Sequence, residues 1–79
     1  MIYLYAGNKS QAEWYARARN IGKDWINLSE PDRQLLGARD GLIIICGEAH
    51  KRFDDLKNME VIRFYEMTRG FKVAYDSYR

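Results

Sequence analysis

The segment at residues 41–47 constrains the fold of this chain most strongly. It reads Gly-Leu-Ile-Ile-Ile-Cys-Gly, so five apolar residues, three of them β-branched isoleucines, lie between two glycines. Polar and apolar residues do not alternate here, and both faces of the segment therefore need burial. A buried helix can share this composition, but five residues bounded by glycines have the length of a strand. We therefore predict a central strand of a parallel sheet.

The rest of the chain predicts strands and helices in alternation. Residues 2–6, 25–28 and 71–75 are rich in β-forming side chains and predict three further strands. Helices are expected at residues 10–21, in a short segment after Ser29, and from Asp54 or Asp55 to Arg69. The expected end signals are Ser10 with Glu13 as a capping box, Gly22, Ser29 with Pro31, and Gly70. The expected packing positions are Ala12, Tyr15, Ala16, Leu35, Leu36, Leu56, Met59, Ile62 and Tyr65.

This βαβαβαβ pattern predicts one α/β domain over residues 1–79, with right-handed crossovers between parallel strands. The strands at residues 2–6 and 42–46 are the most apolar, which places them in the middle of the sheet. We therefore predict the strand order 2-1-3-4. The expected architecture is a minimal three-layer Rossmann-like or flavodoxin-like domain with a four-stranded parallel sheet.

The composition fits a small folded domain: 47% of the residues are hydrophobic and 30% are charged. A net charge of +2 neither requires nor excludes a nucleic-acid partner, although such a partner is not favoured. The single cysteine, Cys46, falls in the predicted core strand, so we expect a buried thiol and neither a disulfide nor a metal site. The longest apolar run is far below the roughly 20 residues that a membrane span needs. We expect a cytoplasmic protein without a signal peptide.

A ligand site is expected where the carboxyl ends of the two central strands meet. A helix amino terminus with a glycine turn can bind an anion, and basic side chains after residue 47 can contact phosphate. A tight capped turn and a solvated loop explain the same residues without a ligand. Neither of the glycine-rich nucleotide-binding motifs is present, and no serine or cysteine has the context of a nucleophile, so no catalytic residue, cofactor or metal is assigned. The candidate ligand-binding residues are Gly7, Asn8, Lys9, Ser10, Gly47, Glu48, His50, Lys51 and Arg52.

The opening residues resemble a family of nucleotide-processing enzymes. Met1-Ile2-Tyr3-Leu4 with Ala6-Gly7 is similar to the start of nucleoside 2-deoxyribosyltransferases. The resemblance implies a Rossmann-like sheet and a catalytic glutamate. It covers about seven residues, those enzymes are roughly twice as long, and no glutamate of this chain can be matched to the catalytic one.

A wider pattern over the first 47 residues is similar to small uncharacterised bacteriophage proteins. It comprises Tyr5-Ala6-Gly7-Asn8, a helix with Ala16-Arg17, residues 25–28 with Ser29 and Pro31, and residues 42–47. The resemblance implies a phage or prophage origin, and it brings no assigned activity.

Two hypotheses for the function follow. The first is a small non-catalytic binding or accessory protein that acts through contact with another protein or with itself as a homodimer, and the resemblance above implies that it is phage-encoded. Six tyrosines and two tryptophans support it, since exposed aromatic residues make good protein-binding patches. The alternative is a nucleotide- or phosphate-binding domain, including a nucleotide-processing one like the deoxyribosyltransferases. A filled crevice or an exposed aromatic patch favours the first hypothesis, and an open pocket between the central strand ends favours the second.

Overall fold

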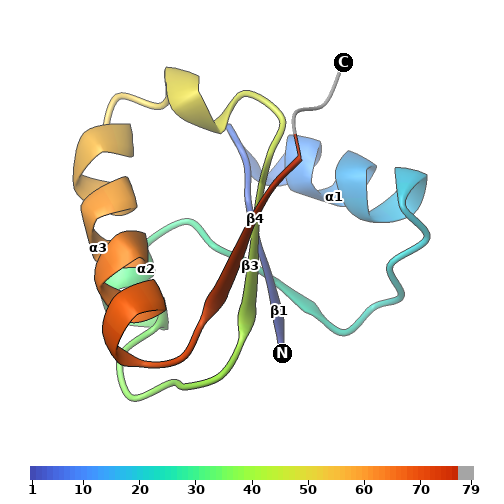
Figure 1. Ribbon diagram of the computed structural model, residues 1–79. Coiled ribbons are helices and arrows are strands. Elements are labelled where there is room, and N and C mark those ends of the chain that lie inside the picture. The colour runs from blue at the N-terminus through green and yellow to red at the C-terminus, as the bar shows by residue number, and fades with distance from the viewer. Residues whose placement is uncertain (77–79) are drawn as a thin grey trace.

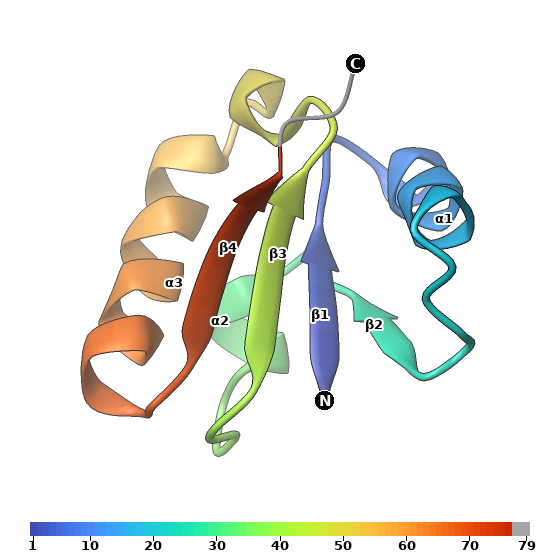
Figure 2. The ribbon, with the colours of Figure 1, turned by 45° about the vertical axis from the view of Figure 1, so that its right-hand side comes forward.

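The computed structural model describes residues 1–76, in which four strands form one parallel sheet. The strands are β1 (Ile2–Tyr5), β2 (Trp25–Asn27), β3 (Leu42–Cys46) and β4 (Lys72–Asp76). Their order is β2-β1-β3-β4, which confirms the predicted order, and Figure 2 shows the four arrows pointing the same way. Strand β3 lies between β1 and β4, as its continuous apolar sequence predicts.

Helices cover both faces of this sheet (Figure 1). Helix α1 (Lys9–Ala18) packs on one face, while α2 (Pro31–Gln34) and α3 (Asp55–Thr68) pack on the other. A short 3₁₀ helix, Ala49–Lys51, lies in the loop after β3. Two apolar clusters fill the spaces between the layers, so the predicted three-layer α/β domain is confirmed. The cluster on the α1 side contains Leu4, Ala6, Ala12, Tyr15, Ala16 and Cys46, and the cluster on the other side contains Tyr3, Tyr5, Leu28, Leu35, Ile43, Ala49, Ile62, Tyr65 and Phe71.

The ends of α1 differ from the prediction. The capping residue is Asn8 and not Ser10, because the Asn8 Oδ1 atom accepts a hydrogen bond of 2.9 Å from the Gln11 backbone N–H. At the other end, Asn20 and not Gly22 takes the left-handed conformation, with a φ of 56°. The Ile21 N–H then donates to the Ala16 carbonyl at 2.8 Å, which closes the helix in a Schellman arrangement. Asparagine tolerates this backbone, so the helix ends earlier than expected.

The amino terminus of α2 is capped by a side chain from within the helix. We expected a Ser29 cap, but the Gln34 Oε1 atom accepts hydrogen bonds from the backbone N–H groups of Ser29 and Glu30 at 2.7 and 2.6 Å. Pro31 lies in the first turn, as predicted, and occupies its first position because Glu30 is the residue before the helix. Leu35 is fully buried, whereas Leu36, the other predicted contact, is exposed.

Helix α3 is rotated relative to the predicted apolar row. Ile62 and Tyr65 are buried as expected, but Leu56 is 82% exposed and Asn58 is buried in its place. Each step of three residues turns by about 60° around a helix, so Leu56 lies opposite Tyr65 and the two cannot both face the core. Two contacts also join the start of the helix to the rest of the protein: the Tyr5 hydroxyl donates to Asp55 at 2.8 Å, and Asp54 pairs with Arg52. Gly70 ends the helix with a φ of 73°, as predicted. Within residues 1–76, no helix has both the length and the apolar character needed to cross a bilayer.

Candidate functional site

The two predicted ligand-binding loops do meet at the carboxyl end of the sheet. The chain leaves β1 toward α1 on one face, and it leaves β3 toward the 3₁₀ helix and α3 on the other. This divergence between neighbouring strands is the usual position of ligands in open α/β sheets. The Gln11 side chain contacts both loops, because its Oε1 atom accepts hydrogen bonds from the N–H groups of Gly7 at 3.0 Å and Glu48 at 2.9 Å. Segments 37 positions apart are thus joined at this point.

Gln11 also fills the crevice between these loops. A Cβ atom built on Gly7 or on Gly47 would lie 2.6 Å from the Gln11 Oε1 atom, so both positions have room only for glycine while the amide stays in place. Gly47 additionally has a φ of 59°, which glycine adopts without strain. The Gln11 Nε2 atom donates to Glu48 at 3.3 Å. Backbone N–H groups that could bind an anion therefore already have an internal acceptor.

Gln11 is the main residue that the sequence reasoning missed. It stands in the first turn of α1, directly after the loop that was singled out. A polar residue in that position usually faces solvent, and nothing local in the sequence indicates that it bridges to another loop. Of the predicted neighbours, Asn8 caps the helix, and Lys9 and Ser10 are exposed in its first turn.

Arg52 points into the protein and not toward a ligand site. Its Nε atom lies 2.9 Å from Asp54 Oδ1, and its Nη2 atom donates to the Ser29 carbonyl at 2.8 Å and to Asp54 Oδ2 at 3.2 Å. A longer bond of 3.4 Å reaches the Ala6 carbonyl, and the guanidinium lies 5.0 Å from the Tyr5 ring centre. Four of the five N–H donors of an arginine are thus engaged. The contact with Asp54 raises the pKa of Arg52. The guanidinium therefore stays charged, and its hydrogen bonds connect separate segments of the protein.

The other charged residues of this loop are exposed. Lys51 and Glu48 form an ion pair of 2.7 Å in which each stabilises the charge of the other, so the pKa of Lys51 is raised and the pKa of Glu48 is lowered. Such an exposed pair contributes little to stability. His50 is exposed on the 3₁₀ helix and lines a pocket.

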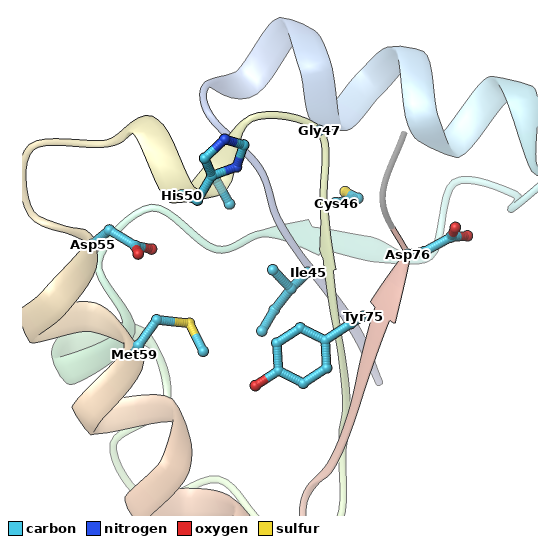
Figure 3. A pocket seen from close by; sticks show the side chains of 9 residues that line it. Ile45, Cys46, Gly47, His50, Asp55, Met59, Tyr75 and Asp76 are labelled. Atoms are coloured by element: carbon cyan, nitrogen blue, oxygen red, sulfur yellow. The ribbon is translucent and has the colours of Figure 1, made fainter. Parts of the chain in front are cut away.

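This pocket, of about 230 Å³, lies one strand away from the predicted crevice, between the ends of β3 and β4 (Figure 3). Its apolar lining includes Ile45, Met59 and the Tyr75 ring, while His50 and Asp55 provide polar groups. In Figure 3, the Asp76 carboxylate points away from these residues. The lining residues are Ile45, Cys46, Gly47, Ala49, His50, Asp55, Met59, Tyr75 and Asp76.

The acidic and nucleophilic groups around the pocket are already engaged or buried. Asp76 accepts a hydrogen bond of 2.6 Å from the Tyr15 hydroxyl and pairs with Arg19 at 3.0 Å. Burial raises the pKa of Tyr15 and of Tyr5 to about 12, so both hydroxyls are neutral donors near pH 7. Cys46 is buried as predicted, and burial raises the pKa of its thiol to about 11. Within residues 1–76, no group of three His, Cys, Asp or Glu side chains is placed to hold a metal ion.

Large apolar side chains gather instead on the outer face of α3. Phe53 is fully exposed, and Leu56, Met67 and Phe64 expose 82%, 77% and 51% of their surface. Leu56, Phe64 and Met67 border a shallow groove of about 430 Å³ that includes two charged side chains, Glu60 and Arg63, whereas Phe53 lies in the turn before the helix. We call this surface the α3 face, and it comprises Leu56, Met59, Glu60, Arg63, Phe64 and Met67.

Comparison with protein-family models, with curated proteins and with solved structures finds no significant match to this chain.

Proposed function

We propose that this protein is a non-catalytic binding module that acts through protein–protein contact, with the α3 face as its contact surface. The observation that carries this proposal is the exposure of Leu56, Phe64 and Met67 on one side of α3. Apolar patches of this kind on small proteins are typical of interaction sites. Aromatic side chains and methionine are enriched in the centres of such interfaces.

The position of Gln11 between the two loops at the carboxyl end of the sheet supports the same proposal. A ligand at the divergence of β1 and β3 would have to displace the Gln11 amide from two backbone N–H groups. Arg52, the predicted phosphate-binding residue with the most contacts, holds three segments of the protein together. The likeness of residues 1–47 to bacteriophage proteins makes a bacterial host protein the first heterologous partner to test.

Site-specific photo-crosslinking tests the contact surface. A photoreactive amino acid in place of Leu56 should give discrete adducts in bacterial lysate or with the purified chain, because this position lies in the α3 face. The same group in place of Arg17, which is exposed on α1, is the matched control. Equal labelling at both positions, or none at position 56, would contradict the proposal.

A nucleotide- or phosphate-binding function is the second candidate. The pocket beside His50, at the ends of β3 and β4, is the observation that favours it. A thermal-shift screen with nucleotides, nucleosides and short oligonucleotides, with inorganic phosphate as the control, tests it. A ligand at a hundredfold excess over its Kd stabilises the folded state by about 2.7 kcal/mol, which shifts Tm by roughly 10–20 °C in a domain of this size. Binding at this site should weaken in His50→Ala and stay unchanged in Lys9→Ala, because Lys9 lies outside the pocket. The absence of any shift would remove this candidate.

A further inference from the structure

We propose that the partner of the α3 face is a second copy of this chain, related by a two-fold axis that runs the two α3 helices antiparallel. The inference rests on the proposed function, because it takes the α3 face as the contact surface. The argument starts from the spacing of four exposed residues, Leu56, Glu60, Arg63 and Met67.

These four residues form a single stripe along α3. Successive members are four, three and four positions apart, which is the alternating spacing of the contact positions in a coiled-coil seam. Leu56 and Met67 stand at the two ends of the stripe, and they expose 82% and 77% of their surface. Phe64 and Met59 flank the stripe and widen its apolar area.

The stripe is self-complementary under an antiparallel two-fold axis. When the axis passes midway between Glu60 and Arg63, Glu60 faces the partner's Arg63 and Leu56 faces the partner's Met67. Both matches come from one placement of the axis, because Leu56 precedes Glu60 by the same four positions by which Met67 follows Arg63. A two-fold interface uses the same patch on both subunits, so each match occurs twice.

The charges in the stripe select this arrangement over a parallel one. Among residues 1–76, neither Glu60 nor Arg63 forms an ion pair within its own chain. A parallel two-fold would place Glu60 against the partner's Glu60 and Arg63 against the partner's Arg63, and like charges would repel. The antiparallel placement instead gives two attractive pairs in the centre, with apolar contacts on both sides. Charge complementarity of this kind sets orientation more than affinity.

The expected dimer is concentration-dependent. Helix α3 has 14 residues and is therefore about 21 Å long. One helix pair of this length gives an interface at the small end of the range for specific complexes. The association should therefore be measured over a wide range of protein concentration.

A charge-swap cycle followed by analytical ultracentrifugation tests this geometry. The wild-type chain should shift from one to two chains as the concentration rises. Glu60→Arg alone and Arg63→Glu alone should each raise the dimer Kd by at least about tenfold, because each creates two pairs of facing like charges. The double variant should restore association, because it re-forms both pairs with the signs exchanged. Glu13→Arg and Arg17→Glu on α1 make the same changes in net charge outside the α3 face and should leave the dimer intact.

Three outcomes would overturn the inference: a wild-type monomer at all concentrations, single swaps without effect, or a double variant that remains monomeric. Glu60 and Arg63 are both exposed, so the variants should keep the fold, and circular dichroism of each variant checks this. A monomeric wild type whose position 56 still crosslinks to another protein would refute self-pairing and leave the binding module standing. A monomer without such crosslinks would refute both proposals.

Discussion

Gln11 shows how one side chain can join two loops at the end of a sheet. Its carbonyl oxygen accepts from two backbone N–H groups that belong to different loops. Glycine at positions 7 and 47 makes room for this amide, since a Cβ atom at either position would collide with it. The glycines that predicted a phosphate-binding turn therefore serve internal packing.

Replacing this residue should weaken the fold. Gln11→Ala leaves the Gly7 and Glu48 N–H groups without their acceptor, although water can partly replace it at this half-exposed site. We expect the free energy of unfolding, measured with urea at pH 7, to fall by about 1–2 kcal/mol. Glu13→Ala, on the exposed side of the same helix, should change it by less than about 0.5 kcal/mol. Equal values for wild type and Gln11→Ala would show that the bridge does not stabilise the protein.

The orientation of α3 shows how an element can depart from its own sequence pattern. The predicted row of Leu56, Met59, Ile62 and Tyr65 winds around the helix because its members are three positions apart, and the helix buries Asn58 and exposes Leu56. Hydrogen bonding of Asp55 by the Tyr5 hydroxyl, together with the ion pair at Asp54, holds the first turn from outside the helix. The apolar residues left outside form the α3 face.

Alanine substitutions at two positions of α3 should distinguish its buried side from its exposed side by their effects on stability. Ile62 is 1% exposed, and Ile62→Ala should lower the free energy of unfolding by about 2–4 kcal/mol through lost burial and a cavity. Leu56→Ala should leave it within about 0.5 kcal/mol of wild type when urea unfolding is measured at low protein concentration. Similar losses in both variants would mean that Leu56 is buried in the folded monomer.

Across the whole molecule, Arg52 ties together segments that are far apart in the chain. It contacts the end of β1 at Ala6, the connection before α2 at Ser29, and the start of α3 at Asp54. Its planar fork reaches all three at once, and lysine cannot reproduce that geometry. Arg52→Lys should therefore lower the free energy of unfolding by about 1–3 kcal/mol. Lys51→Ala, at the neighbouring exposed position, is the control and should show no measurable change.

The Arg52–Asp54 pair also predicts a dependence of stability on pH. Hydrogen bonding by Arg52 holds the pKa of the Asp54 carboxyl below its usual range. The folded state thus favours the charged carboxylate, so the stabilisation is present above the ordinary aspartate pKa and is lost as the pH falls through the lowered value. Asp54→Asn should be less stable than wild type at pH 7, and this difference should shrink as the pH is lowered past the ordinary aspartate range. A difference that stays constant in urea unfolding from pH 7 to strong acid would contradict this linkage.

The sequence by itself determined the type of fold. The apolar runs in β1 and β3 are long enough to require burial on both faces, and this places them in the middle of the sheet wherever the helices lie. Gly70 and Pro31 mark helix ends through their own backbone preferences, which need no distant partner. These features are local, and they were predictable for that reason.

Only the tertiary structure decided what lies at the end of the sheet and which residues face outward. The loops around residues 7 and 47 were correctly expected to be neighbours, but whether a ligand or a side chain fills the space between them depends on Gln11. The inward turn of Arg52 depends on carbonyl groups at Ala6 and Ser29, and the first turn of α3 is contacted at Asp55 by the Tyr5 hydroxyl. Each of these contacts joins residues more than 20 positions apart, and no local pattern in the sequence encodes such a pairing.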